Sequence, residues 1–178
     1  FGGGPQPCGT NPEVQALVAQ AALAELAAHP GQRVVSVSQN DNDLYCRCPA
    51  CAAIDAREGT PMGSQLTLVN AVAAEVAKAR PDAKVGTLAY WHTRRPPSRL
   101  CPAANVQIQL ANIESCCLHA WDDTTCAANA AFLRDLRGWC ALTDQVYVWT
   151  YVTDFRYYDL PFPNLRAIGP NLRLLADL

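Results

Sequence analysis

The sequence predicts an α/β fold assembled from parallel β/α units. β-branched segments that begin near residues 34, 84, 106 and 146 alternate with segments of helical periodicity. Strands that alternate with helices in this way form parallel sheets. A (β/α)8 barrel usually needs about 250 residues. Four strands in 178 residues therefore correspond either to a small open sheet or to about half of a TIM-type barrel.

The first helix is expected to begin beside Asn11 and Pro12. Asn11 can accept hydrogen bonds from the first turn, and Pro12 stands where its missing N–H costs nothing. Apolar residues then recur with a helical period until His29-Pro30-Gly31 ends the helix. The same reasoning predicts helices over residues 64–80 and about 127–142, and a last helix that starts after a break at Gly169-Pro170.

Four strands are expected, over residues 33–38, 84–91, 105–114 and 145–152. The first is a continuous β-branched run, which is typical of a strand buried on both faces of a parallel sheet. The second and third strands lie too close in sequence for a helix between them. We therefore predict an irregular, proline-containing loop at that connection.

Composition indicates one globular domain and excludes two kinds of partner. Half of the residues are hydrophobic, 17% are charged and the formal net charge is −2, so neither disorder nor a nucleic-acid partner is expected. No apolar stretch reaches the ~20 residues that a membrane helix needs, so no membrane partner is expected. The chain starts Phe-Gly-Gly-Gly-Pro without Met. Either processing has removed the beginning or the chain is a piece of something longer, and the half-barrel interpretation leads us to expect that residues 1–178 are a single partial domain, a fragment of a longer chain.

Polar and aromatic residues follow all four strands, where ligands of parallel α/β proteins gather. Asp41 follows the first strand and Glu114 the third, and we predict that this pair is catalytic. Glycoside hydrolysis needs one carboxyl group as acid and another as base or nucleophile. The predicted substrate-binding residues are Asn40, Asn42, Tyr90, Trp91, His92, Trp149, Tyr151 and Asp154. The alternative is structural, because Asn-Asp-Asn also forms ordinary turns and tryptophans often fill cores.

The nine cysteines are an odd number, so at least one thiol is free or paired outside the chain. Cys46, Cys48 and Cys51 have a spacing that can hold a structural zinc ion. Cys117, His119 and Cys126 are candidates for the fourth ligand. Disulfides that fix the loop after the first strand are equally compatible with the pattern. The chemistry predicted above requires no other cofactor.

Several short motifs follow one another along nearly the whole chain. They are SVSQNDN at 36–42, YCRCPAC at 45–51, TLAY at 87–90, TRRPP at 93–97, IESCC at 113–117, YVTDF at 151–155 and LPFPNL at 160–165. With these motifs in this order, the chain resembles the bacterial domain of unknown function 4838 family, a glycoside-hydrolase-like family.

The resemblance implies a (β/α)8 barrel related to those of α-glucuronidases and hexosaminidases, of which this chain would be about half. By the strand order of related barrels, Asp41 would be the acid/base and Glu114 its partner, while His119 matches a histidine that follows Cys-Cys in family members. The expected function is glycoside hydrolysis in a secreted or periplasmic protein. Its partners would be an oligosaccharide or polysaccharide and the remainder of the parent barrel. The alternative is a non-catalytic carbohydrate-binding or cysteine/metal-stabilised structural module.

Overall fold

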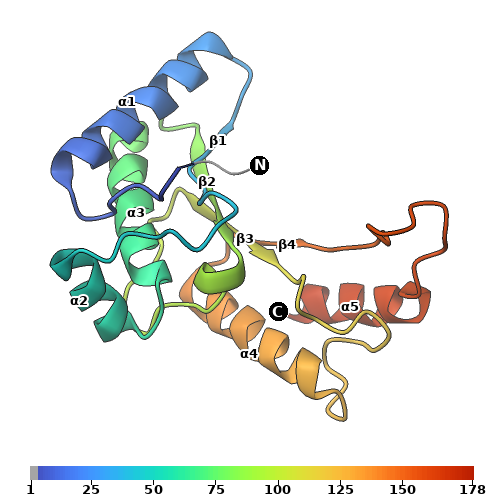
Figure 1. The fold of residues 1–178 in the computed structure, drawn as a ribbon. Coiled ribbons are helices and arrows are strands. Elements are labelled where there is room, and N and C mark those ends of the chain that lie inside the picture. Colours follow the sequence, from blue (N-terminus) through green and yellow to red (C-terminus); the bar gives the residue numbers. More distant parts are fainter. Residues whose placement is uncertain (1–3) are drawn as a thin grey trace.

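One parallel sheet forms the centre of the computed structural model, which describes residues 4–178 (Figure 1). Its four strands lie side by side in the order of the chain. They are β1 (Val34–Ser36), β2 (Lys84–Ala89), β3 (Val106–Ala111) and β4 (Val146–Trp149). All three pairings are parallel. The predicted α/β fold with parallel β/α units is therefore confirmed.

Helices cover one face of this sheet. α1 (Pro12–Ala28) packs on α3 (Met62–Ala79), and α3 also contacts α2 (Pro49–Glu58) and β2. α4 (Ala127–Leu142) and α5 (Leu165–Asp177) complete the core with Trp139 and Leu174. Successive strands that are neighbours and are joined by right-handed crossovers place their helices on a single face. No helix among the described residues is long and apolar enough to cross a membrane.

The alternation of the strands divides the sheet into a buried and an open face. Val85 and Ile108 point toward the helices and are fully buried. Gln109 and Tyr147 are paired in the register and point the other way, and both are exposed. Trp149 extends the same open face and is 48% exposed.

The helix over residues 12–28 is confirmed with its cap, because the Asn11 side chain accepts hydrogen bonds from the backbone N–H groups of Glu13 and Val14. The helices expected over residues 64–80 and 127–142 are also present. The predicted burial of the first strand on both faces is wrong. Val34 and Ser36 are exposed, because helices cover one face only.

Two further helix predictions need correction. α2 was not among the expected helices, although Cys48 is its N-cap, Pro49 opens it and Gly59 ends it with a left-handed φ of 73°. The last helix begins at Leu165 and runs through Pro170 instead of starting after it. Gly169 relieves one part of the strain, because the proline ring clashes with the N–H and the Cβ of a helical residue before it, and glycine has no Cβ.

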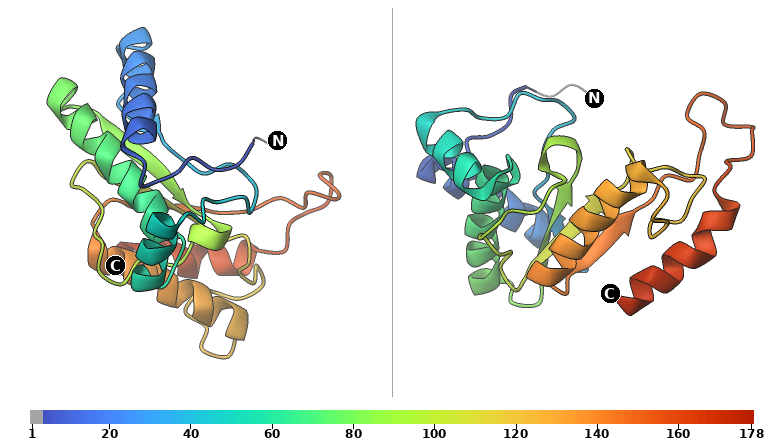
Figure 2. Two further views of the ribbon diagram at one scale, coloured as in Figure 1. Left: turned by 60° about the vertical axis from the view of Figure 1, so that its left-hand side comes forward. Right: turned by 90° about the horizontal axis from the view of Figure 1, so that it is seen from below.

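The loops at the carboxyl ends of the strands differ in shape. A 3-10 turn, η1 (Trp91–Thr93), follows β2, and the predicted irregular loop continues from it to β3. Figure 2 shows that the connection between β4 and α5 extends away from the sheet. These loops form the candidate site.

Candidate active site and cysteine clusters

A pocket of about 690 Å³ opens at the carboxyl ends of the strands. Each strand or the loop that follows it contributes to its lining. The polar side chains come from Gln39, Asn40 and Asp41, and the rings come from Tyr90, Trp149, Tyr151 and Phe155. Aromatic rings beside amides and a carboxylate can stack on the C–H faces of a ligand while they hydrogen-bond its polar groups.

Two tyrosines connect the two predicted carboxylates. Burial, together with the charge of Asp41 and a hydrogen bond to it, raises the pKa of Tyr90 to about 12, and the charge of Glu114 adds to the shift. Burial also raises the pKa of Tyr151, with smaller contributions from Glu114 and Asp41. The charges of both carboxylates therefore contribute to the raised pKa of each phenol.

The turn after β2 fixes Tyr90. Trp91 has a φ of 54°, which lies in the left-handed region. This conformation costs a residue that has a Cβ roughly 1–2 kcal/mol. Thr93 Oγ1 accepts a hydrogen bond from the Tyr90 backbone N–H and donates one to the Gln39 side chain. Gln39 in turn donates to the Tyr90 carbonyl at 3.2 Å. The chain therefore turns sharply after β2, and the end of β1 holds the turn in place.

Glu114 is held by a cation. Arg94 Nη1 lies 2.9 Å from Glu114 Oε2, and Arg94 Nε lies 2.8 Å from Asp135 Oδ2 on α4. Burial lowers the pKa of Arg94, but the two carboxylates outweigh this effect and raise it. The Glu114 side chain is partly exposed. The residue before it, Ile113, lines the pocket.

Five of the predicted site residues line the pocket: Asn40, Asp41, Tyr90, Trp149 and Tyr151. Glu114 does not line the pocket, although the residue before it, Ile113, does. The structure does not bring four others into the lining: Asn42, Trp91, His92 and Asp154.

The structure shows what those four residues do. The Asn42 side chain accepts hydrogen bonds from Gln6 and from the Leu44 backbone N–H. His92 stacks on Tyr45 at a ring separation of 4.8 Å, and burial lowers its pKa. Trp91 is exposed after its left-handed turn. The Asp154 carboxylate accepts from backbone N–H groups within its own loop.

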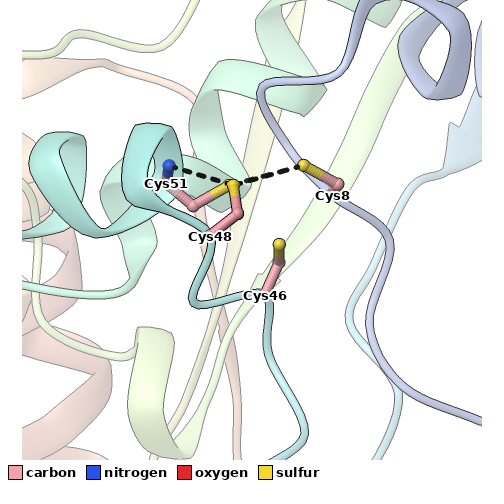
Figure 3. Close-up of side chains that lie close together, drawn as sticks. All are labelled: Cys8, Cys46, Cys48 and Cys51. Atoms are coloured by element: carbon pink, nitrogen blue, oxygen red, sulfur yellow. Dashed lines mark hydrogen bonds between the residues drawn. The ribbon is translucent and has the colours of Figure 1, made fainter.

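Four cysteines meet beside α2 (Figure 3). Cys8 Sγ lies 3.8 Å from Cys48 Sγ and 3.7 Å from Cys51 Sγ, and all four sulfurs, Cys46 included, are within 4.8 Å of one another. Four sulfurs at about 2.3 Å from one tetrahedral metal ion are about 3.8 Å apart, whereas a disulfide needs about 2.05 Å. The cluster is therefore compatible with metal binding, and none of the nine cysteines, all within the described residues, forms a disulfide.

The electrostatics of this cluster favour a compensating cation. The Thr10 hydroxyl, by hydrogen bonding, lowers the pKa of Cys8 to about 6. The Cys48 backbone N–H lowers the pKa of Cys46, but burial and the three neighbouring thiols outweigh it and raise the pKa to about 12. Four thiols this close resist joint ionisation, because each thiolate opposes the next. A metal ion removes that conflict.

The predicted fourth ligands are wrong for this cluster. Cys8 takes that place, and His119 and Cys126 lie together at a separate group with Cys116. Cys117 belongs to neither group, and its thiol donates to the Ser115 carbonyl.

Sequence reasoning also missed Arg94 as the partner of Glu114 and Phe155 as a pocket ring. A pair of basic residues directly after the second strand was the available signal for Arg94. Phe155 stands in a long loop with several other aromatic residues, and no pattern distinguished it.

No curated protein and no solved structure gives a significant match to this chain. The match to a family is extensive by contrast, and it includes both cysteine clusters and every pocket residue. A sequence model of the family described as Domain of unknown function (DUF4838) matches residues 4–178, and the chain therefore belongs to that family.

Proposed function

We propose that the pocket binds a carbohydrate and that Asp41 and Glu114 hydrolyse its glycosidic bond. One observation carries the proposal: Asp41 lines an aromatic pocket at the carboxyl ends of the strands, and Glu114 directly follows Ile113, which lines the same pocket. Paired carboxyl groups beside stacking rings are what glycoside hydrolysis requires.

Each residue has a defined role in this reaction. Asp41 donates a proton to the leaving oxygen, and Glu114 either activates a water molecule or attacks the anomeric carbon. Arg94 provides the positive charge that orients Glu114. Trp149 and Phe155 offer faces for the sugar ring, and Asn40 offers an amide for its hydroxyls.

The sheet supports a further part of the proposal, that these strands are about half of a barrel. They follow one another without reversal, and helices cover one face. The open face, with Gln109, Tyr147 and Trp149, would line the interior after closure by the remainder of the parent barrel. Residues 1–178 expressed alone are expected to associate through unpaired strand edges. A monodisperse monomer that melts cooperatively would contradict this.

The cluster of Cys8, Cys46, Cys48 and Cys51 is proposed to hold a structural zinc ion. Tetrahedral sites with four sulfur ligands are typical of structural zinc. The ion would join the segment before α1 to the start of α2. Metal analysis of the purified protein tests this, and Cys8→Ser is expected to remove one zinc ion per chain. Cys101→Ser, an exposed thiol outside the cluster, is the matched control. Equal zinc content in the two variants would contradict the proposal.

A non-catalytic carbohydrate-binding module is the second candidate. It is favoured by the ion pair that Glu114 makes within the protein, since Arg94 Nη1 lies 2.9 Å from Glu114 Oε2. In that case the same pocket would bind sugar without turnover.

The deciding experiment measures turnover and binding in the full-length protein. A panel of aryl glycosides and oligosaccharides is assayed with wild type, Asp41→Asn, Glu114→Gln and the control Asp144→Asn, an exposed carboxylate before β4. Loss of a general acid or base is expected to reduce turnover at least about 100-fold. Turnover that survives both changes would reject the catalytic assignment, whereas binding without any turnover would support the module.

A further inference from the structure

A second group of metal-binding side chains lies in the loop between β3 and α4. Cys116 Sγ lies 3.3 Å from His119 Nδ1, and the ligand atoms of Cys116, His119 and Cys126 are all within 4.8 Å of one another. Sulfur and nitrogen atoms on one tetrahedral zinc ion are about 3.6 Å apart, given bond lengths of about 2.3 and 2.05 Å. The separation of Cys116 and His119 is therefore close to that of two ligands of one ion.

A buried asparagine holds this loop in shape. Asn129, on the first turn of α4, is fully buried, and its Oδ1 accepts a hydrogen bond from the Cys116 backbone N–H at 2.8 Å. Its Nδ2 donates to the carbonyls of His119 at 3.1 Å and Ala120 at 2.9 Å. Cys126 stands three residues before Asn129 in the chain, so the Asn129 side chain holds Cys116 and His119 close to Cys126. The hydrogen bonds of the protein therefore position the three candidate metal ligands.

Cys126 is the N-cap residue of α4, so the start of that helix sets its position. The neighbouring Cys117 lies outside the group, and its thiol donates to the Ser115 carbonyl.

We propose that Cys116, His119 and Cys126 bind a second zinc-like transition-metal ion, independent of the cluster at Cys8. Two sulfurs and an imidazole nitrogen suit zinc, and three protein ligands leave one position for water. Cys116 also lines a cavity of about 150 Å³ with Asn112 and Tyr151. The ion would fasten the loop that starts two residues after Glu114, and so it would fix the rim of the main pocket.

Metal stoichiometry in single variants of the purified protein tests the proposal. Cys126→Ser and His119→Ala are expected to lose one zinc ion per chain and to keep the ion of the Cys8 cluster. Cys117→Ser is the matched control, since this thiol is adjacent to Cys116 but outside the group. It is expected to keep the wild-type content. Cys8→Ser tests the first cluster, and Cys126→Ser and His119→Ala test the second. A wrong assignment of one metal site can therefore be told apart from a wrong assignment of the other.

A second measurement covers the case in which a variant folds poorly. Wild-type protein is treated with a thiol-alkylating reagent before and after removal of metal by a chelator, and labelled peptides are identified by mass spectrometry. Protection of Cys116 and Cys126 that is lost with the metal supports the site. A Cys116–Cys126 disulfide in protein isolated without reductant would overturn it. An unchanged zinc content in Cys126→Ser would also overturn the proposal. So would alkylation of Cys116 and Cys126 that is the same before and after treatment with the chelator.

Discussion

Arg94 Nη1 lies 2.9 Å from Glu114 Oε2, while the same guanidinium binds Asp135, which is only 7% exposed. Removal of the cation leaves that buried carboxylate unpaired. Fully buried pairs cost ~3–5 kcal/mol when broken, and this pair is partly exposed, so we expect Arg94→Gln to lower the free energy of unfolding by about 2 kcal/mol. Chemical denaturation measures the change. Arg95→Gln, at an exposed neighbouring position, should change it little, and equal effects would contradict the assignment.

Glu58 predicts a dependence of stability on pH. This buried carboxylate accepts hydrogen bonds from the backbone N–H groups of Arg99 and Leu100. Burial raises its pKa, but these bonds and Arg57 outweigh burial and lower it. A lowered folded-state pKa stabilises the protein above the unfolded value of about 4.3, and this contribution is lost as the pH falls below it.

We therefore expect Glu58→Gln to cost about 2 kcal/mol of unfolding free energy at neutral pH. The difference from wild type should shrink toward pH 3. Denaturation at several pH values provides the measurement, with the exposed Glu75→Gln as control. A constant difference across that range would show that the hydrogen bonds to Glu58 do not depend on its charge.

Tyr90 should titrate later than an ordinary tyrosine. Its pKa is raised to about 12 by burial and by Asp41, so Asp41→Asn is expected to shift its ionisation to lower pH. Because the folded pKa is raised, stability should also fall as the pH rises above about 10. Ultraviolet titration follows the phenolates, and Tyr90→Phe identifies the late component. Tyr147→Phe, on the open face, should leave that component in place.

Gly9 should control the cysteine cluster through a close backbone approach. A Cβ at this position would overlap the Ser64 carbonyl oxygen, so the segment that carries Cys8 would have to move. We expect Gly9→Ala to cost about 2 kcal/mol of stability and to weaken metal binding about tenfold or more. Competition with a chromogenic chelator measures the affinity. Gly31→Ala, whose Cβ would meet nothing within 4 Å, should be neutral.

Most of the fold could be predicted because it depends on local periodicity. The helices that contain Leu26, Val69 and Trp139 show their buried faces in the sequence, and all three residues are fully buried. α2 lacks such an apolar face, because its buried residues are Cys51 and Glu58. Its cap at Cys48 and its end at Gly59 are ordinary helix signals.

The site was only partly predictable because neighbouring residues at a strand end point in different directions. The rule that ligands gather at the carboxyl ends of strands identified Asp41, Tyr90 and Trp149. The rule also included Trp91 and His92, which lie outside the lining because the chain turns at Trp91, where φ is left-handed. A tryptophan at this position gives no sign of that conformation in the sequence. Cys8 could not be assigned either, because its distance from Cys48 is set by the packing of α1 and α3.

Each connection at the carboxyl ends is held by a residue outside it. The loop after β1 meets Cys8, the loop after β2 is bound by Glu58, and the loop after β3 is bound by Asn129. Within the described residues, the connection after β4 is held only at its start, where the Tyr151 N–H donates to the Asn112 side chain. Farther along, it presents exposed side chains such as Tyr158, and its Tyr157 and Leu160 N–H groups bond within it. Residues 156–159 lie between the motifs at 151–155 and 160–165, so substitutions there can reshape this connection without loosening the rest of the rim.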